Sequence, residues 1–400
     1  MKEGWKVKKL KEVFDILNGY AFKSENYVES GLRIIRISNV QNGYIDDKEP
    51  EYYPIETSDG LANYLLREKD LLMSLTGNVG RVGFLPKNLL PAALNQRVAC
   101  LRPISKKDIN LNFFFYLFRS TKFLNDCLES ARGVAQPNLS TTWLSKYPIP
   151  VPPLPEQERI VGRLDELFAH LDALQQNTQR AIDSAKELFQ SKLQQAMTPK
   201  DGWKQETMGN FFDITSSKRV FQADWKSEGV PFYRAREIVK IAKQGYVNNE
   251  LFISEDMYNE YSTKYGVPKA GDILITGVGT LGICYIVKEN DRFYFKDGNI
   301  IWLKKKREIN SRFVEYAYKT DYIVNQVNSG SGATVGTYTI VRAKDTKIFV
   351  PSIEEQGRIV EELDALSKEI EQLQANFERQ AARVEELKQS ILHEAFEGNL

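Results

Sequence analysis

Apolar residues recur at alternating steps of four and three over two long stretches of the chain, residues 160–188 and 359–391. This spacing places them along one face of a helix, as in the seam of a coiled coil. A proline-rich lead-in, residues 147–153, precedes the first stretch, and Pro351 precedes the second. Glycine follows each stretch, which is typical of a helix end. The pattern predicts two long helices of about 42 residues, each about 63 Å long.

The large apolar residues of the two predicted stripes are spaced in the same way in both helices. In chain order they are Ile160, Leu164, Leu167, Leu171, Leu174, Leu188, Ile359, Leu363, Leu366, Ile370, Leu373, Phe377, Val384, Leu387 and Ile391. A helix with a single apolar stripe needs a partner to cover it. We expect the two helices to pair with each other, antiparallel, which would give the chain pseudo-two-fold symmetry. The alternatives are that each helix packs on its own domain or on another subunit.

The sequence contains an internal repeat, with two copies of one unit. Gly4-Trp5-Lys6 recurs as Gly202-Trp203-Lys204 at an offset of 198 residues, and Glu156-Gln157 recurs as Glu355-Gln356 at an offset of 199. A nearly constant offset indicates tandem duplication of a unit that is too long for a solenoid repeat. Each unit is therefore a domain followed by a helix. The predicted divisions are a first domain at 1–152, a first helix at 153–198, a second domain at 199–351 and a second helix at 352–400.

The two domains are predicted to have a mixed α/β (α+β) fold. Their strand-like stretches are short and rich in turns, and strands and helices do not alternate regularly, so a doubly wound sheet is not expected. The predicted strands are Leu32–Ile37, Asp70–Leu75, Arg97–Leu101, Asp272–Thr276, Ile283–Val287 and Ile300–Leu303. The predicted short helices are Asn112–Phe118 and Ser311–Tyr318.

Charge is separated along the chain, although the formal net charge of the whole is only +1. Residues 1–152 and 199–351 each carry a net charge of +5, whereas the two helical stretches together carry −9. The overall balance excludes a uniformly basic protein but leaves two moderately positive domains. Positive surfaces with interspersed Asn, Gln and Tyr suit contact with phosphates and base edges.

The amino-acid composition argues against histidine-based catalysis, a disulfide framework and a membrane-spanning segment. The two histidines, His170 and His393, both fall in the predicted helices, so histidine-based catalysis and histidine-rich metal sites lose their usual residue. The three cysteines are widely separated, which fits a reducing cytoplasm and no disulfide framework. The chain has no apolar run of membrane-spanning length, and its start lacks the apolar region of a signal peptide. We therefore expect a cytoplasmic protein with no membrane partner.

A glycine pattern, Gly277-x-Gly279-x-x-Gly282, formally matches the dinucleotide-binding fingerprint. The fingerprint requires a helix after the glycines, but residues 283–287 read as a strand. A strand–turn–strand loop is therefore expected, and an enzyme that binds a nucleotide at Gly277–Gly282 is a minor alternative. The chain also has no phosphate-binding G-x-x-x-x-G-K-[ST] loop and no tetrapeptide of the amino-methyltransferase type. We predict no catalytic residue, no metal ligand and no cofactor in this chain.

Polar and basic side chains gather in predicted loops of both domains and are our candidates for DNA contact. In the first domain they are Arg36, Asn39, Gln41, Asn42, Tyr44, Thr76, Asn78, Arg81, Gln96, Arg97, Arg132, Gln136 and Asn138. In the second they are Arg234, Arg236, Lys240, Thr276, Thr280, Lys296, Asn299, Ser331, Thr334 and Thr337. The argument depends on loops that match between the copies, because a single polar residue is usually a solvated surface side chain.

The order of these features resembles the specificity subunit of type I restriction–modification systems. The residues that carry the resemblance are Ile149–Leu154 with Glu156-Gln157 and Ile160-Val161, and Phe349–Pro351 with Glu355-Gln356 and Ile359-Val360. Supporting stretches are Gly133–Leu139, Ile34–Val40 and Gly271–Ile275. The resemblance covers the whole chain. It is weaker at residues 332–336, which replace the sequence of residues 133–137, and different target sequences would explain this.

The resemblance implies that each domain is a target-recognition domain that reads one half of a split, double-stranded DNA sequence. The helices would set the spacer between the half-sites, and Glu156, Gln157, Glu355, Gln356 and the two apolar stripes would serve in the spacer and in docking two methyltransferase subunits. Those subunits would bring S-adenosylmethionine and methylate adenine. Restriction subunits with ATP- and magnesium-dependent translocase and nuclease activity would join them. The alternative is a protein–protein scaffold with twin binding domains on a coiled-coil spacer.

Overall fold

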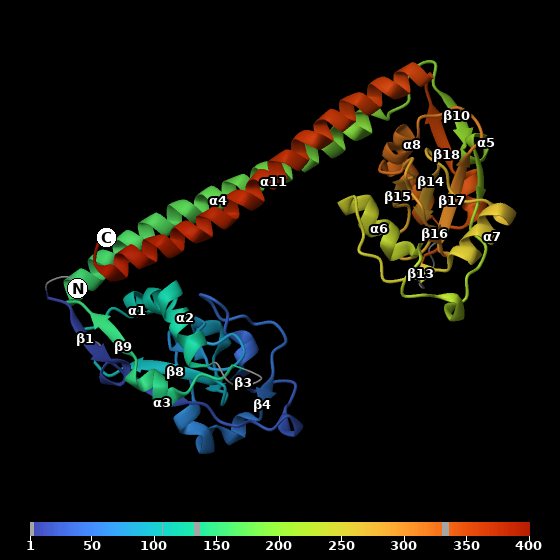
Figure 1. The fold of residues 1–400 in the computed structure, drawn as a ribbon. Coiled ribbons are helices and arrows are strands. Elements are labelled where there is room, and N and C mark those ends of the chain that lie inside the picture. Colours follow the sequence, from blue (N-terminus) through green and yellow to red (C-terminus); the bar gives the residue numbers. More distant parts are fainter. Residues whose placement is uncertain (1–3, 106, 132–136, 330–335) are drawn as a thin grey trace. The chain divides into compact units, whose positions relative to one another are not determined.

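The structure, a computed structural model, describes residues 4–105, 107–131, 137–329 and 336–400 (Figure 1). The chain forms two compact units. Unit 1 consists of Met1–Thr178 with Phe377–Leu400, and unit 2 consists of Gln179–Asn376. Each unit therefore holds one globular part and a portion of both long helices.

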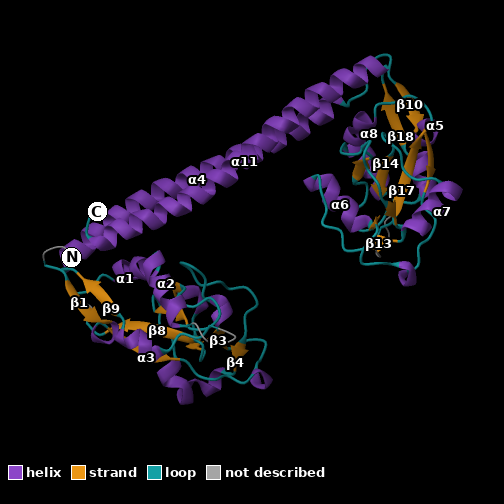
Figure 2. Ribbon diagram, viewed as in Figure 1, coloured by secondary structure: helices purple, strands orange, loops and turns teal. Residues whose placement is uncertain are grey.

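The globular part of unit 1 combines short strands with three short α-helices (Figure 2). In chain order its elements are β1 (Lys6–Lys9), β2 (Phe14–Asn18), β3 (Leu32–Ile35), β4 (Tyr52–Tyr53), β5 (Leu71–Ser74), β6 (Val82–Phe84), β7 (Ala92–Leu94), β8 (Val98–Pro103), α1 (Leu111–Phe118), α2 (Thr121–Ser130), α3 (Thr141–Lys146) and β9 (Pro148–Val151). An antiparallel sheet has the order β2–β8–β5–β6, and a smaller sheet has the order β4–β3–β7. Strands β1 and β9 pair where the domain meets its helix.

The globular part of unit 2 repeats this topology. Its elements are β10 (Lys204–Thr207), α5 (Met208–Phe211), β11 (Phe212–Thr215), β12 (Val230–Tyr233), α6 (Ala235–Gln244), β13 (Phe252–Ile253), α7 (Glu255–Tyr265), β14 (Ile273–Thr276), β15 (Cys284–Ile286), β16 (Tyr294–Phe295), β17 (Ile300–Lys305), α8 (Ser311–Ala317), α9 (Asp321–Asn328), α10 (Ile340–Asp345) and β18 (Lys347–Val350). The sheets have the orders β11–β17–β14–β15 and β13–β12–β16, and β10 pairs with β18. The mixed α/β fold is confirmed, and the repeated strand order agrees with a duplicated unit.

The two copies differ in the segments that follow β3 and β4 in unit 1 and β12 and β13 in unit 2. Unit 2 has the α-helices α6 and α7, whereas unit 1 has short 3-10 helices at Ile37–Asn39 and Ile55–Tyr64. Neither α6 nor α7 is predicted from the sequence, which places Arg234 and Arg236 in a loop. That assignment is wrong, because Arg234 is the N-cap of α6 and Arg236 lies in its first turn. The copies therefore share their strand order but differ in the helices that connect the strands.

The two long helices are α4 (Leu154–Ala196) and α11 (Ile353–Glu397), close to the predicted bounds. In unit 1 the early α4 residues Ile160 and Leu164 share a core with Leu392 and Ala395 of late α11. In unit 2 the late α4 residue Leu193 shares a core with Ile359 and Leu363 of early α11. The helices therefore run antiparallel in each unit, as predicted (Figure 1).

Each long helix also packs on the globular part of its unit. The core around Ile160 and Leu164 includes Phe113 and Phe114 of α1, and these four side chains are at most 1% exposed. Pairing between helices and packing on the domain were considered as alternatives, but both occur at the same helix ends. The apolar surface of α1 thus anchors the helix pair to the domain.

The predicted apolar stripe is wrong at three positions. Leu174, Leu188 and Leu387 are 44%, 53% and 48% exposed. Val384 of α11, at 5% exposure, is buried as its place in the stripe predicts, whereas the buried position in this part of α4 is Ile182, at 2% exposure. Straight helices with 3.6 residues per turn drift from a strict seven-residue repeat, so the seam moves along the helix surface. His170 and His393 are exposed on these helices, as predicted.

A pair of substitutions on α4 tests the corrected seam. Leu193→Ala should lower the free energy of unfolding by about 2–5 kcal/mol, because this side chain is fully buried between the helix pair and the domain. Leu188→Ala, on the same helix, should change it by less than about 0.5 kcal/mol, because the side chain faces solvent. Urea denaturation of the full chain measures both. Equal losses would contradict the seam.

Candidate nucleic-acid interface

Four loops of the first domain meet beside the end of β5, and we call them loop cluster 1: residues 41–44, 75–82, 95–97 and 137–139. The Arg81 guanidinium donates to Gln41 Oε1 at 3.0 Å, which joins the first two loops. The backbone N–H of Leu75 donates to the Arg97 carbonyl at 3.0 Å. Thr76 Oγ1 lies 3.2 Å from Asn138 Oδ1 and joins the last loop. Candidate residues that are far apart in sequence therefore share one surface.

The second domain builds the same arrangement, loop cluster 2, from residues 277–283, 296–299 and 336–338. The backbone N–H of Gly277 donates to the Asn299 carbonyl at 2.9 Å, as Leu75 does to Arg97 in the first copy. The backbone N–H of Tyr338 donates to the Gly277 carbonyl at 2.9 Å, as that of Leu139 does to Leu75. The two clusters thus share these two backbone hydrogen bonds, although their side chains differ and cluster 1 has an additional segment, residues 41–44.

Several predicted contact residues are exposed in these clusters or beside them. They are Asn42, Tyr44, Asn78, Gln96, Arg97 and Asn138 in unit 1, and Arg236, Lys240, Thr280 and Thr337 in unit 2. Others are half-buried: Arg36, Gln41, Arg81, Arg234, Lys296 and Asn299. Arg132, Gln136, Ser331 and Thr334 lie outside the described residues.

Three predicted contact residues are buried and hold the loops together instead. Asn39 accepts a hydrogen bond from the Arg36 backbone at 2.8 Å and donates to the Asp46 carbonyl at 3.0 Å. The Thr276 hydroxyl accepts from the Ile283 backbone at 3.0 Å inside its hairpin. Thr76 is 9% exposed, Asn39 3% and Thr276 fully buried. These internal hydrogen bonds favour a role in holding the loops together over the predicted contact with DNA.

The arginines at the start of α6 are held by one buried carboxylate. Arg234 binds both oxygens of Glu237, with N–O distances of 3.0 and 2.9 Å, and Arg236 Nε lies 2.6 Å from Glu237 Oε1. Burial raises the pKa of Glu237, but hydrogen bonds from Arg234 and Arg236 outweigh burial and keep this pKa below the usual glutamate range. The carboxylate therefore fixes two guanidinium groups while cancelling part of their charge. Lys240, two turns of backbone from Arg234, is exposed on the same helix.

The glycine-rich segment Gly277–Gly282 is a hairpin turn, as predicted. Strands β14 and β15 on either side of it pair antiparallel, with Ile275 opposite Cys284. A Cβ atom at Gly277 would lie 2.7 Å from the Tyr338 carbonyl oxygen, so a side chain does not fit where the two loops cross. The glycine therefore serves loop packing, and the strand that follows it is not the helix that a dinucleotide fingerprint requires.

The described residues offer no metal site or reactive thiol. No group of three or more His, Cys, Asp or Glu side chains is arranged to hold a metal ion in the described part of the chain. The three cysteines are buried free thiols, and burial raises the pKa of Cys127 to about 12. None of the described helices combines the length and hydropathy needed to cross a bilayer.

Sequence reasoning missed a pair of equivalent surface hollows, one in each unit. Hollow 1, about 470 Å³, lies between α2, β9 and the end of α11, and hollow 2, about 120 Å³, lies between α9, β18 and the end of α4. Positions that line both are Leu117/Ala317, Ser120/Thr320, Lys122/Tyr322, Phe123/Ile323, Pro150/Phe349, His393/Gln194, Phe396/Met197 and Glu397/Thr198. The repeat offset relates these positions, and it is the only signal in the sequence that could have indicated them.

Solved structures share this fold. A chain in a study of complex assembly and conformational transition of the type I R-M system matches with a TM-score of 0.74 and 20% identity, covering 100% of this chain and 99% of that one. The HsdS subunit of Thermoanaerobacter tengcongensis matches with a TM-score of 0.57 and 19% identity, covering 100% and 98%. At this level of identity the similarity establishes the fold.

Sequence comparisons identify the family. The type I restriction enzyme EcoAI specificity subunit of Escherichia coli is 31% identical over 172 residues, which are 42% of this chain and 29% of that protein. The EcoBI specificity subunit of E. coli is 26% identical over 433 aligned positions, covering 100% of this chain and 86% of that protein. The family profile "Type I restriction modification DNA specificity domain" matches residues 2–183 and 200–378. The chain therefore belongs to this family, as a non-catalytic DNA specificity subunit of a type I restriction–modification system with two target-recognition domains.

Proposed function

We propose that each globular domain reads one half of a bipartite DNA target through its loop cluster, and that α4 and α11 set the spacer between the halves. The observation that carries this proposal is the recurrence of one loop arrangement, with the same backbone hydrogen bonds, in two domains that each carry a net charge of +5. A positive surface attracts the phosphate backbone, and exposed Asn, Gln and Arg side chains can read base edges in the major groove. Two equivalent readers suit two half-sites.

The proposed contact set follows exposure in the structure. Asn78, Gln96, Arg97 and Asn138 would read or position one half-site. The α6 arginines, with Lys240, Thr280 and Thr337, would serve the other. Gln41 and Arg81 would act mainly by holding their loops together, since their side chains bond to each other. The four candidates outside the described residues stay in the proposed set on the basis of their sequence positions.

We further propose that the chain docks two identical methyltransferase subunits, one on each unit. The support is the pair of hollows at equivalent positions, lined by both apolar and polar side chains. Duplicated surfaces fit two copies of one partner. S-adenosylmethionine would bind to those subunits, and ATP and magnesium to the restriction and translocase subunits that complete the assembly, which would work in the cytoplasm.

Salt dependence of DNA binding tests the proposal against a protein–protein scaffold. In complex with the methyltransferase subunit, Arg97→Ala and Lys240→Ala should each weaken binding to duplex DNA and reduce the slope of log affinity against log salt by about 1, because each removes a phosphate contact. Arg163→Ala, an exposed arginine on α4 paired with Glu166, is the charge-matched control and should leave the slope unchanged. A wild-type complex without a salt slope would contradict DNA binding.

Exchange of the two globular parts should reverse the order of the half-sites. Swapping residues 10–147 with residues 208–346 leaves the β1–β9 and β10–β18 ladders on their own helices and moves both loop clusters. Because the domains share their topology, the exchanged chain should fold. Mapping of methylated adenines in a host genome reads the outcome. A motif with unreversed halves would show that the domains do not carry the specificity.

Lengthening both helices by one heptad should lengthen only the spacer. Seven residues inserted after Thr178 and seven after Asn376, at the boundary between the units, keep the seam in phase. The added rise of about 10.5 Å corresponds to roughly three base pairs. The same insertion in α4 alone is the control and should abolish methylation, because the helices then fall out of register. An unchanged spacer in the double insertion would contradict the ruler role.

A further inference from the structure

The glutamine of each Glu-Gln pair is buried at the start of its long helix. Gln157 of α4 is fully buried, and Gln356 of α11 is 2% exposed. Both residues were expected to serve in the spacer and in docking, but buried side chains do not reach a partner subunit. Their burial inside the joint between domain and helix gives them a different use.

In both copies this glutamine accepts a hydrogen bond from the N-cap residue of a short helix in the domain, and so links the long helix to the domain. Gln157 Oε1 accepts from the Asn110 backbone N–H at 2.9 Å, and Gln356 Oε1 accepts from the Asn310 backbone N–H at 2.8 Å. Asn110 and Asn310 are the N-caps of α1 and α8, and their side chains accept from Asn112 N–H and Arg312 N–H, respectively. One amide therefore couples the start of the long helix to the start of a domain helix.

The nitrogen of the same amide secures the connecting segment. Gln157 Nε2 donates to the Pro152 carbonyl at 2.8 Å and to the Asp108 carbonyl at 3.1 Å. Gln356 Nε2 donates to the Pro351 carbonyl at 3.0 Å. The Pro152 and Pro351 carbonyls belong to the proline-containing lead-ins that join domain and helix, and the Asp108 carbonyl lies just before α1. Both the oxygen and the nitrogen of this buried amide are hydrogen-bonded. Rotation of the helix against the domain would therefore leave buried polar groups without partners, which is costly.

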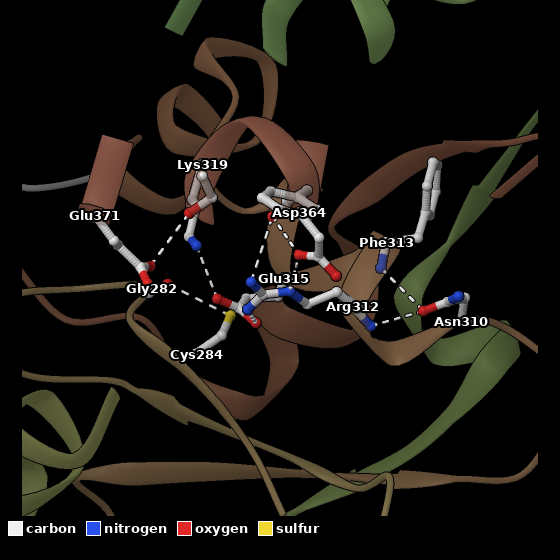
Figure 3. Close-up of polar contacts among 11 residues, drawn as sticks. Gly282, Cys284, Asn310, Arg312, Phe313, Glu315, Lys319, Asp364 and Glu371 are labelled. Atoms are coloured by element: carbon white, nitrogen blue, oxygen red, sulfur yellow. Dashed lines mark hydrogen bonds and ion pairs between the residues drawn. The ribbon is translucent and has the colours of Figure 1, made fainter. Parts of the chain in front are cut away.

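A second repeated contact lies eight residues further along each helix. Tyr116 donates to Asp165 at 2.5 Å in unit 1, and Tyr316 donates to Asp364 at 2.6 Å in unit 2. Figure 3 shows the unit 2 contact region, where Arg312 Nε also binds Asp364 at 2.8 Å. Eight residues span about 12 Å of helix. With one contact the long helix could rotate about that point against its domain. Two contacts at this separation fix the direction of the helix relative to the domain.

The space between the two contacts is filled by apolar packing. Ile160 and Leu164 are both 0% exposed, and Ile359 and Leu363 are 6% and 1% exposed at the equivalent positions. Apolar packing excludes water but is not directional, so it allows small rotations of the helix against the domain. The hydrogen bonds at Gln157 and Gln356 supply the missing directionality.

We propose that Gln157 and Gln356 are positioning residues that fix the angle between each target-recognition domain and its helix, and so define the spacer length that the protein accepts. This inference rests on the proposed function, because a spacer has meaning only if the two domains read two half-sites. The glutamines act on spacing alone, since they lie outside both loop clusters. Base preference within each half-site belongs to the loops.

The test compares methylation of DNA substrates that differ only in spacer length. Gln157→Met and Gln356→Met keep side-chain length and leave the Asn110 or Asn310 N–H without its acceptor. In the complex with the methyltransferase subunit, each should reduce the preference for the native spacer over a spacer one base pair longer by on the order of tenfold, as expected from loss of one or two buried hydrogen bonds. The preference among half-site sequences should be unchanged.

Matched controls remove a part-buried hydrogen bond far from the joint. Tyr53→Phe removes the bond from Asn26, and Tyr285→Phe removes the bond to Asp291, each in the outer core of its domain. Both should retain full spacer preference. Should a methionine variant fail to fold, Tyr116→Phe and Tyr316→Phe, which keep the aromatic ring and remove only the hydroxyl, are expected to relax the spacer in the same direction, since they remove the second contact.

The outcomes separate this inference from the function on which it rests. If the wild-type complex methylates all spacer lengths equally, the proposed function is wrong. If the wild-type complex prefers one spacer, and the folded joint variants retain that preference in full, the positioning role of Gln157 and Gln356 is wrong. Loss of half-site preference together with spacer preference would also overturn it, since that pattern reports general damage to the domain.

Discussion

Burial of the apolar stripe on each long helix is the constraint on which the rest of the structure depends. Neither helix can cover its own stripe, and in each unit the two helices and one domain share a single core. In unit 1 the start of α4 meets the end of α11 under α1, and in unit 2 the end of α4 meets the start of α11 under α8. The antiparallel direction of the helices follows from this sharing.

This arrangement makes each domain a part of the helical framework and frees its other end for recognition. The joint uses residues that recur in both copies, including the amides of Gln157 and Gln356 and the tyrosine–aspartate pairs. The loop clusters recur in their backbone hydrogen bonds but differ in their side chains. Under the proposed function, a constant frame with variable loops would let one subunit recognise two unrelated half-sites without changing the frame.

Sequence predicted the features that periodicity and repetition encode. The helix pair, the duplicated domain and the hairpin at Gly277–Gly282 follow from spacing, and the structure has them. The predicted apolar stripe is wrong at Leu174, Leu188 and Leu387. A straight helix has 3.6 residues per turn, so its buried face shifts by about one residue over several turns relative to a seven-residue repeat. Asn39 and Thr276 were predicted to contact DNA, but their side chains bond to their own loops. The sequence cannot distinguish such a side chain from one that faces solvent, because the difference lies in the loop geometry. The hollows escaped prediction because their walls come from segments far apart in sequence.

Site-specific photocrosslinking tests most directly whether the two loop clusters read different halves of one target. Asn78 and Thr280 occupy equivalent exposed positions in the two hairpin turns and would each carry a photoreactive residue in the assembled complex on its target DNA. The account predicts crosslinks from Asn78 to one half-site and from Thr280 to the other. Crosslinks from both positions to the same half-site, or to the spacer alone, would contradict it.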